Sequence, residues 1–267
     1  MTIGIAGAGH MGGAILRGLA TCPQKPALRV FDSDAARAAA LAAETGACAA
    51  PDAAACAAGC DAVVCAVRPA DMPALLAALV PAATPDGPLV LSIAAGRTTA
   101  WIESLLPPGA RVVRALPNLG ASVGLAATAF ALGARATPAD AALAQTVLSS
   151  FGAATALPES QLDAVTALSG SGPAFFAAAL EYLAEGGAAL GLAPETARAL
   201  AVQTMLGTAT VLARPGAPAP DRFVASVATP GGTTAAGMDV LSASDAKAVF
   251  AATLAAAARR AAQLASS

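Results

Sequence analysis

Residues 3–12 read Ile-Gly-Ile-Ala-Gly-Ala-Gly-His-Met-Gly, and residues 11–20 have the composition of a helix. A Gly-x-Gly-x-x-Gly pattern therefore stands between a short apolar strand and a helix, where it is typical of a dinucleotide-binding loop. Gly7 permits the tight turn, Gly9 lets a pyrophosphate approach the backbone, and Gly12 lets the helix pack on the strand. The free N–H groups and the dipole at the helix start favour phosphate. A glycine turn without a ligand is the alternative interpretation.

The same alternation of strand and helix continues up to about residue 157. Strands that are apolar throughout belong in a parallel sheet covered on both faces, so we expect a doubly wound (Rossmann) α/β domain over residues 1–157. The predicted strands are 3–6, 28–31, 62–66, 89–93 and 112–116, and the predicted helices are 11–20, 33–44 and 71–80.

Residues 158–267 lack strand patterns and are expected to form an all-α C-terminal domain. Pro194 stands at a first helical position, where its missing N–H costs nothing. Gly186 and Gly187 are expected to permit close helix contact. Alanine-rich helices offer flat faces but little core of their own, so we expect an obligate dimer built from this half. The predicted helices are 173–190, 194–213 and 246–264, with a loop at 214–221.

Composition narrows the class of protein. The chain is 57% hydrophobic with a mean hydropathy of +0.66, but alanine runs inflate both values. The uncharged stretches 115–134 and 164–180 are broken by Pro, Gly, Ser or Thr, whereas a membrane-spanning helix needs about 20 mainly apolar residues. No membrane span is therefore expected. A net charge of −2 without a basic run argues against nucleic acid. The start lacks a basic n-region, so we expect no secretory signal and a cytoplasmic location.

The cysteines give no sign of a metal or redox site. They are odd in number and form no Cys-x-x-Cys pair, so we interpret them as small apolar fillers in a reducing cytosol. No metal is expected, because the usual ligand spacings are missing. The five cysteines are Cys22, Cys48, Cys56, Cys60 and Cys65.

Asp32 bears on the choice of dinucleotide. It lies about 20 residues beyond Gly12, where a carboxylate usually accepts hydrogen bonds from the ribose of NAD and repels a 2′-phosphate. Arg37 offers an alternative partner for such a phosphate, although a solvated helix arginine is commoner. The choice between NAD and NADP therefore stays open. His10, the single histidine, is interpreted as a loop side chain near the phosphates rather than an acid catalyst.

Two later blocks resemble the pyrroline-5-carboxylate reductases. Residues 163–176 read Asp-Ala-Val-Thr-Ala-Leu-Ser-Gly-Ser-Gly-Pro-Ala-Phe-Phe, and residues 230–237 read Pro-Gly-Gly-Thr-Thr-Ala-Ala-Gly. The resemblance extends over nearly the whole chain in the family's order, through residues 5–12, 66–69, 92–96 and 114–118. Departures are Arg68 where the family usually has Lys, Leu119-Gly120 for Thr-Pro, and Ser226 for Asn. They leave details of cofactor binding open.

The resemblance implies an oxidoreductase that reduces 1-pyrroline-5-carboxylate to L-proline with NAD(P)H, the last step of proline biosynthesis. It also implies a helical domain that builds a homodimer, with the active site at the junction of the domains, and in many members a larger ring of dimers. NADPH is the family's usual hydride donor, and many members accept NADH. Cofactor contacts carry over to Ala6, Gly7, Ala8, Gly9, His10, Met11, Gly12, Asp32, Ala66, Val67, Arg68, Pro69, Ala94, Ala95, Gly96 and Ser226.

Substrate contacts carry over to Glu159, Thr229, Gly232, Thr233 and Thr234. Successive N–H groups at the glycine turn, leading into a predicted helix at 235–241, can form an anion nest for the substrate carboxylate. We assign the catalytic role to Thr234, whose hydroxyl can hydrogen-bond the ring nitrogen. A glycine turn with a threonine N-cap is the plainer alternative. The segment 169–173 is interpreted as a flexible turn before a buried helix. Direct contact with the substrate and a closely packed helix start are the two alternatives for it, and a solvated loop carboxylate is an equal alternative for Glu159.

Two rival functions remain. A β-hydroxyacid dehydrogenase-like reductase has a similar build, but it relies on a helix lysine near the domain junction. Lys25 is expected in a loop and Lys247 in the last helix, so that group is missing. A dinucleotide sensor without turnover is the second rival, and it would not need an anion nest.

Overall fold

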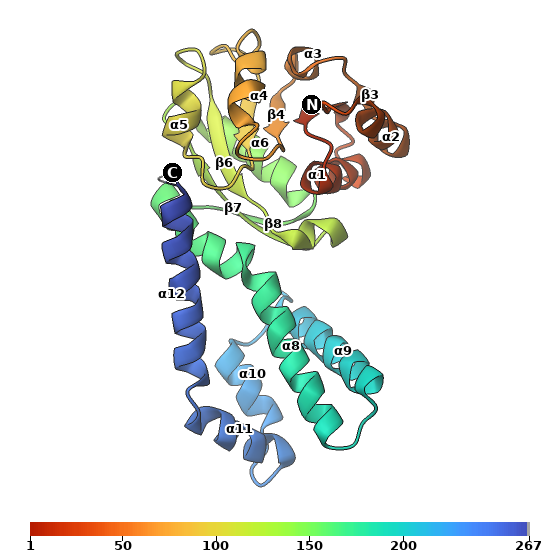
Figure 1. Cartoon of the computed structure of the whole chain (residues 1–267), viewed down its shortest axis with the longest axis vertical. Helices are drawn as coiled ribbons and strands as arrows, with labels where there is room; N and C mark the ends of the chain where they lie inside the picture. The colour runs from red at the N-terminus through yellow and green to blue at the C-terminus, as the bar shows by residue number, and fades with distance from the viewer. Residues whose placement is uncertain (266–267) are drawn as a thin grey trace. The chain divides into compact units, whose positions relative to one another are not determined.

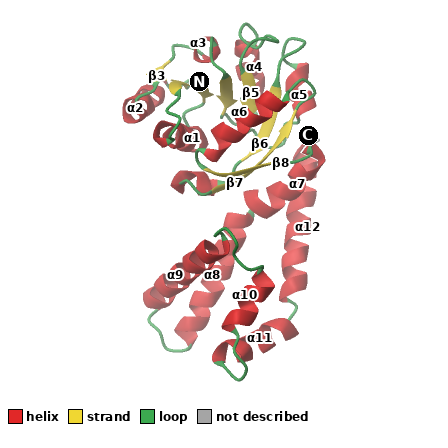
Figure 2. Cartoon of the chain, turned by 180° about the vertical axis from the view of Figure 1, so that it is seen from behind, coloured by secondary structure: helices red, strands yellow, loops and turns green. Residues whose placement is uncertain are grey.

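The computed structural model describes residues 1–265. The chain folds into two compact units, Met1–Ser171 together with the chain end from Ala257, and Gly172–Ala256. The first compact unit extends to Ser171, beyond the expected domain boundary near residue 157. That boundary stays a prediction. Figures 1 and 2 show the sheet of the first unit and the helices of the second.

The first unit contains an eight-stranded sheet in the order β3-β2-β1-β4-β5-β6-β7-β8. All five predicted strands are present, and neighbouring strands are parallel except β6 and β7, which are antiparallel. The sequence missed β3, β7 and β8 because their runs are short or rich in alanine and glycine. The strands are β1 Thr2–Ala6, β2 Ala27–Phe31, β3 Cys48–Ala49, β4 Ala62–Cys65, β5 Leu89–Ser92, β6 Val112–Leu116, β7 Ala126–Leu132 and β8 Gly152–Ala156.

Helices cover both faces of this sheet, which confirms the doubly wound fold (Figure 1). Leu16 and Val147 belong to the core on one face, and Leu76 and Ile102 to the core on the other. All four side chains are fully buried. The helices are α1 His10–Thr21, α2 Ala35–Thr45, α3 Ala53–Ala57, α4 Met72–Leu79, α5 Thr99–Ser104 and α6 Pro138–Ser149, with the 3-10 turn η1 Leu119–Val123.

A short helical segment ends the first unit. It comprises η2 Glu159–Gln161, α7 Leu162–Val165 and the π-helix η3 Thr166–Gly170. The prediction of a flexible turn at 169–173 is wrong, because Ser171 N–H donates to the Thr166 carbonyl at 2.9 Å and closes a π-turn. Glycine and serine at these positions favour a turn locally, but the hydrogen bonds around them are helical.

The second unit is all-helical, which confirms the predicted fold class of the C-terminal half. Gly187 permits close packing of α8 and α9, since a Cβ there would lie 3.3 Å from Ala197 Cβ. Helix α8 is not buried within this chain: Phe176 is 62% and Leu183 68% exposed. The predicted loop at 214–221 ends at Pro220, where a helix begins. The helices are α8 Gly172–Ala189, α9 Pro194–Leu212, α10 Pro220–Val227, α11 Thr233–Ala243 and α12 Ala246–Ala265.

Within residues 1–265, no single helix has both the length and the apolar composition to cross a membrane. Helices α11 and α12, bent by 56° at their junction, meet these criteria only as a pair, by length and composition.

Candidate functional site

The glycine loop after β1 has the backbone geometry of a phosphate-binding turn. Gly7 has φ of +112°, in the region that favours glycine, and its N–H donates to the Phe31 carbonyl at 2.7 Å. A Cβ on Gly12 would overlap the Gly7 carbonyl, so the helix start requires glycine there. Around Gly9, by contrast, no atom lies within 4 Å of a built Cβ. The backbone at Gly9 is therefore open to a ligand at the start of α1.

A cleft of about 700 Å³ lies at the carboxyl ends of β1, β2 and β4. This edge of a parallel sheet is where doubly wound folds bind ligands. Eight predicted cofactor residues line it: Gly7, Gly9, His10, Met11, Asp32, Ala66, Val67 and Arg68. Arg37, the alternative phosphate partner, also lines the cleft, as do five residues that the sequence did not single out: Ser33, Asp34, Asp71, Ile93 and Pro117. Of the other predicted contacts, Ala6, Ala8, Gly12 and Ala94 are buried beside the cleft, and Pro69, Ala95 and Gly96 lie in the adjoining loops.

Asp32 is held firmly at one end of this cleft. Its side chain is 8% exposed, and Oδ2 accepts the Ala8 N–H at 2.7 Å, so the carboxylate fixes the glycine loop. Oδ1 accepts the Asp34 N–H at 2.9 Å and lies 3.3 Å from Arg37 Nη1. Arg37 also pairs with Asp34 at 3.2 Å. Two carboxylates therefore surround one guanidinium here, an arrangement that disfavours a further negative charge.

The loops after β4 and β5 border the same cleft. Arg68 is 84% exposed and pairs with Asp71 at 2.9 Å, so its guanidinium is solvated. After β5, Ser92 Oγ accepts the Ala94 N–H at 3.3 Å, and Gly96 turns the chain with φ of +72°. The predicted contacts at 94–96 thus lie in a loop whose shape is set by the Ser92 hydrogen bond and by the turn at Gly96.

Glu159 is engaged within the first unit. Its Oε1 accepts the Thr99 N–H at 2.8 Å, and Arg114 Nη1 lies 3.1 Å from the same oxygen. Its Oε2 accepts the Thr99 hydroxyl. Burial would raise the pKa of Glu159, but the bonds from Thr99 and the guanidinium of Arg114 together hold the pKa below its usual range. The carboxylate is therefore ionised at neutral pH and occupied, which supports a structural role that the sequence did not reveal.

The Gly-Gly-Thr-Thr turn lies in the second unit. Gly231 has φ of +73°, and the Gly232 N–H donates to the Thr229 carbonyl at 2.9 Å. Helix α11 begins at Thr233, and its N-cap is Gly232, which has no side chain to cap the helix. The alternative of a threonine N-cap is therefore wrong. Within the described residues, the Thr234 hydroxyl has no hydrogen-bond partner, so the turn offers free donors.

Ser226 lies on α10, close in sequence to this turn. Its hydroxyl donates to the Phe223 carbonyl at 2.7 Å, and its side chain is exposed.

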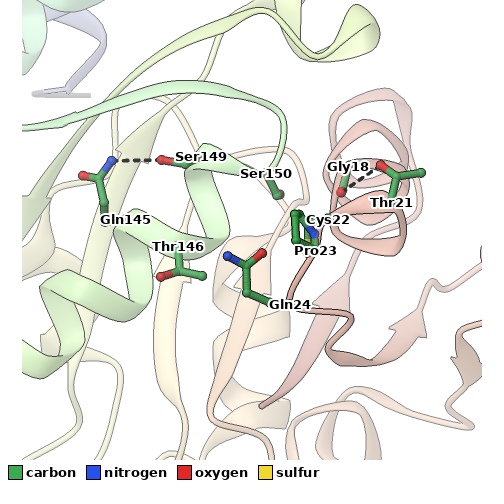
Figure 3. Close-up of a pocket in the computed structure, with 9 residues that line it drawn as sticks. All are labelled: Gly18, Thr21, Cys22, Pro23, Gln24, Gln145, Thr146, Ser149 and Ser150. Carbon is green, nitrogen blue, oxygen red and sulfur yellow. Dashed lines mark hydrogen bonds between the residues drawn. The ribbon is translucent and has the colours of Figure 1, made fainter.

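A second polar pocket of about 530 Å³ lies between the end of α1 and α6 (Figure 3). Gln145 donates to Ser149 at 2.9 Å on one wall, and Thr21 donates to the Gly18 carbonyl at 3.2 Å on the other. Its lining has no ionisable side chain other than the Cys22 thiol. It therefore lacks the charged side chains on which acid–base catalysis relies.

Burial suppresses the ionisation of two cysteine thiols in this fold. Four of the five cysteines are buried and Cys48 is exposed. Burial raises the pKa of Cys56 and of Cys65 to about 12, so neither thiol ionises at neutral pH. Over the described part of the chain, no three His, Cys, Asp or Glu side chains come together as metal ligands.

Comparison with known proteins identifies relatives for both halves of the chain. Residues 159–264 match the family model for pyrroline-5-carboxylate reductase dimerisation, and residues 2–96 match that for NADP oxidoreductase, coenzyme F420-dependent. A structure of a pyrroline-5-carboxylate reductase from Coxiella burnetii superposes with a TM-score of 0.94 at 31% identity, covering 98% of this chain and 97% of that one.

Curated relatives match over a shorter region. The pyrroline-5-carboxylate reductase of Methanosarcina acetivorans is 42% identical over 162 residues, which are 61% of this chain and 60% of that protein. The enzyme of Mycobacterium tuberculosis is 42% identical over 164 residues, covering 55% of this chain and 56% of that protein. The aligned region thus spans less than two thirds of these relatives.

Proposed function

Because this chain belongs to the pyrroline-5-carboxylate reductase family, we propose that it reduces 1-pyrroline-5-carboxylate to L-proline with NADPH or NADH, the last step of proline biosynthesis. The observation that carries this proposal is the match to the Coxiella burnetii reductase over 98% of the chain.

The cleft after β1 suits a nicotinamide dinucleotide. Gly9 leaves the backbone open, the N–H groups at the start of α1 favour the pyrophosphate, and Asp32 lies at the end of β2 where a ribose binds. The loops at 66–69 and 94–96 complete the proposed contacts of this unit. Ser226 is a further proposed cofactor contact, on the family resemblance. The bound cofactor supplies the hydride, and the protein supplies alignment and electrostatics.

The Gly231–Thr234 turn suits the substrate. A substrate carboxylate accepts hydrogen bonds from the free N–H groups at the start of α11, which need no basic side chain. The imine carbon is most electrophilic when the ring nitrogen carries a proton, and the Thr234 hydroxyl holds that nitrogen in place. Thr229, Gly232 and Thr233 shape the turn around the ring. Glu159 is proposed as a further substrate contact on the family resemblance.

The helical unit is proposed to form the homodimer. Large apolar side chains of α8 and α9 are exposed in the single chain, including Phe176, Leu183 and Leu200 at 62%, 68% and 54%. Exposed apolar area on this scale marks an interaction surface, and the dimerisation family model covers the same residues. Further assembly into a ring of dimers and a cytoplasmic location remain part of the proposal.

The β-hydroxyacid dehydrogenase-like alternative receives no support from the lysines. Lys25 lies in the loop before β2 with φ of 42°, and Lys247 is in the first turn of α12. The dinucleotide sensor is separated from the reductase by turnover. An assay that follows NADPH and NADH oxidation with 1-pyrroline-5-carboxylate, and identifies proline as product, tests the proposal directly. Nucleotide binding without imine-dependent oxidation would favour the sensor and refute the reductase.

A further inference from the structure

Arg114 places a positive charge inside the sheet of the first unit. It lies in the middle of β6, its side chain is 4% exposed, and its carboxylate partner is Glu159 at 3.1 Å. Its Nε atom is buried and, among the described residues, without a hydrogen-bond partner. Breaking a buried ion pair leaves an uncompensated charge, which is strongly destabilising. The fold therefore holds Glu159 against Arg114.

Glu159 transmits this constraint to helix α5. Thr99, the first residue of α5, donates its N–H to Oε1 at 2.8 Å and its hydroxyl to Oε2. Hydrogen bonds from backbone or hydroxyl donors to a carboxylate are stronger than bonds between neutral groups. The Glu159 carboxylate, which is paired with Arg114 of β6, therefore sets the position of the first turn of α5.

The first turn of α5 is continuous with the loop that borders the nucleotide cleft. Ile93 lines the cleft, and Gly96 turns the chain with φ of +72° before α5. The Arg97 guanidinium lies 4.6 Å from the centre of the Trp101 ring, and the Thr98 hydroxyl accepts the Trp101 N–H at 3.1 Å. These two contacts tie residues 97 and 98 to α5, so a shift of α5 moves the end of the loop.

We propose that Arg114 is a positioning residue for the nucleotide, which acts through Glu159 and Thr99 to fix loop 93–98 beside the cleft. The proposal rests on the proposed function only in taking NAD(P) as the ligand of the cleft. Arg114 holds the carboxylate, and the carboxylate provides an acceptor for each of the two donors of Thr99. The observable consequence is a change in nucleotide affinity, whereas a substrate contact by Glu159 alone predicts a change in KM for the imine.

The test measures NADP⁺ binding by calorimetry and amide exchange of the peptide 93–104 by mass spectrometry. Glu159→Gln keeps the size of the side chain but removes its charge, and Thr99→Val removes one donor. We expect the Kd for NADP⁺ to rise about 3- to 20-fold in Glu159→Gln and by about 2- to 5-fold in Thr99→Val. Exchange in 93–104 becomes faster in both, while residues 2–12 exchange at the wild-type rate. Arg114→Lys keeps the positive charge, and its Kd for NADP⁺ should lie between those of the wild type and Glu159→Gln.

Asp140→Asn provides a matched control. Asp140 is 1% exposed and pairs with Arg111 at 2.5 Å, so this substitution breaks another buried ion pair of the same unit that does not border the cleft. It should lower Tm but leave NADP⁺ affinity and exchange in 93–104 unchanged. The proposal is overturned if folded Glu159→Gln and Thr99→Val bind NADP⁺ and exchange like the wild type, and Thr99→Val alone decides if Glu159→Gln does not fold. A failure of the proposed function appears separately, as intact NADP⁺ binding by a protein that does not oxidise NADPH when the imine is added.

Discussion

Replacement of Thr234 by valine tests the role assigned to its hydroxyl. Thr234 is exposed in the first turn of α11, and its hydroxyl has no partner within residues 1–265. Valine has nearly the shape of threonine, so Thr234→Val removes one oxygen without breaking a hydrogen bond in the described part of the chain. The free energy of unfolding should therefore change by less than about 0.5 kcal/mol. A fall in turnover in this variant therefore reports the loss of the hydroxyl from the active site and not a loss of stability.

The expected loss is that of one hydrogen bond to the ring nitrogen. Leaving a polar group unpaired in a closed site costs about 1–3 kcal/mol, which corresponds to a fall in kcat/KM of about 5- to 150-fold. The affinity for NADP⁺ should stay at the wild-type value, because the proposed nucleotide contacts of the glycine loop are in the first unit.

Initial rates of NADPH oxidation, with the imine varied at saturating cofactor, give kcat and KM for this comparison. Thr146→Val is the matched control, since its hydroxyl donates to the Ala142 carbonyl at 2.9 Å on α6, and it should leave the rates unchanged. A wild-type kcat/KM in Thr234→Val would refute the reasoning, and the partner of the nitrogen would then have to be another group, such as a bound water.

Three further changes have defined outcomes. Asp32→Ser removes one of two carboxylates beside Arg37 and should raise the ratio of kcat/KM for NADPH to that for NADH; an unchanged ratio places Asp32 away from the ribose. Leu183→Glu puts a charge on the exposed face of α8 and should yield a monomer by light scattering that has no reductase activity. A wild-type protein that is a stable, active monomer at micromolar concentration contradicts the dimer. The lowered pKa of Glu159 gives stability that is full above its unfolded value of about 4.3 and is lost as pH falls through the lower folded pKa. The free energies of unfolding of the wild type and Glu159→Gln, measured with denaturant, should therefore converge at acid pH. A difference between the two that stays constant down to acid pH contradicts this prediction.

The glycine turn at 231–234 was predictable in part. The sequence marked it as an anion nest or a capped helix start, and only the backbone showed that Gly232 is the N-cap and that Thr234 is free. Segment 169–173 shows the opposite case. Its glycines and serines favour a turn locally, but Asn118 Nδ2 donates to the Ser169 carbonyl at 3.0 Å, and a π-turn forms. Asn118, 51 positions before Ser169, thus bonds to a π-turn that the local sequence did not predict.

The sequence by itself determined the parallel sheet, its dinucleotide loop and the helical second half, because these depend on local hydrophobic runs, glycines and helix signals. Tertiary structure alone decided the antiparallel β7, the exposure of α8 and the partners of Glu159. The bonds of Glu159 to Arg114 and Thr99 join residues 45 and 60 positions apart, so no local pattern encodes them. The burial of Arg114 likewise depends on which elements cover β6, and a buried charge selects its partner only once the chain has folded around it.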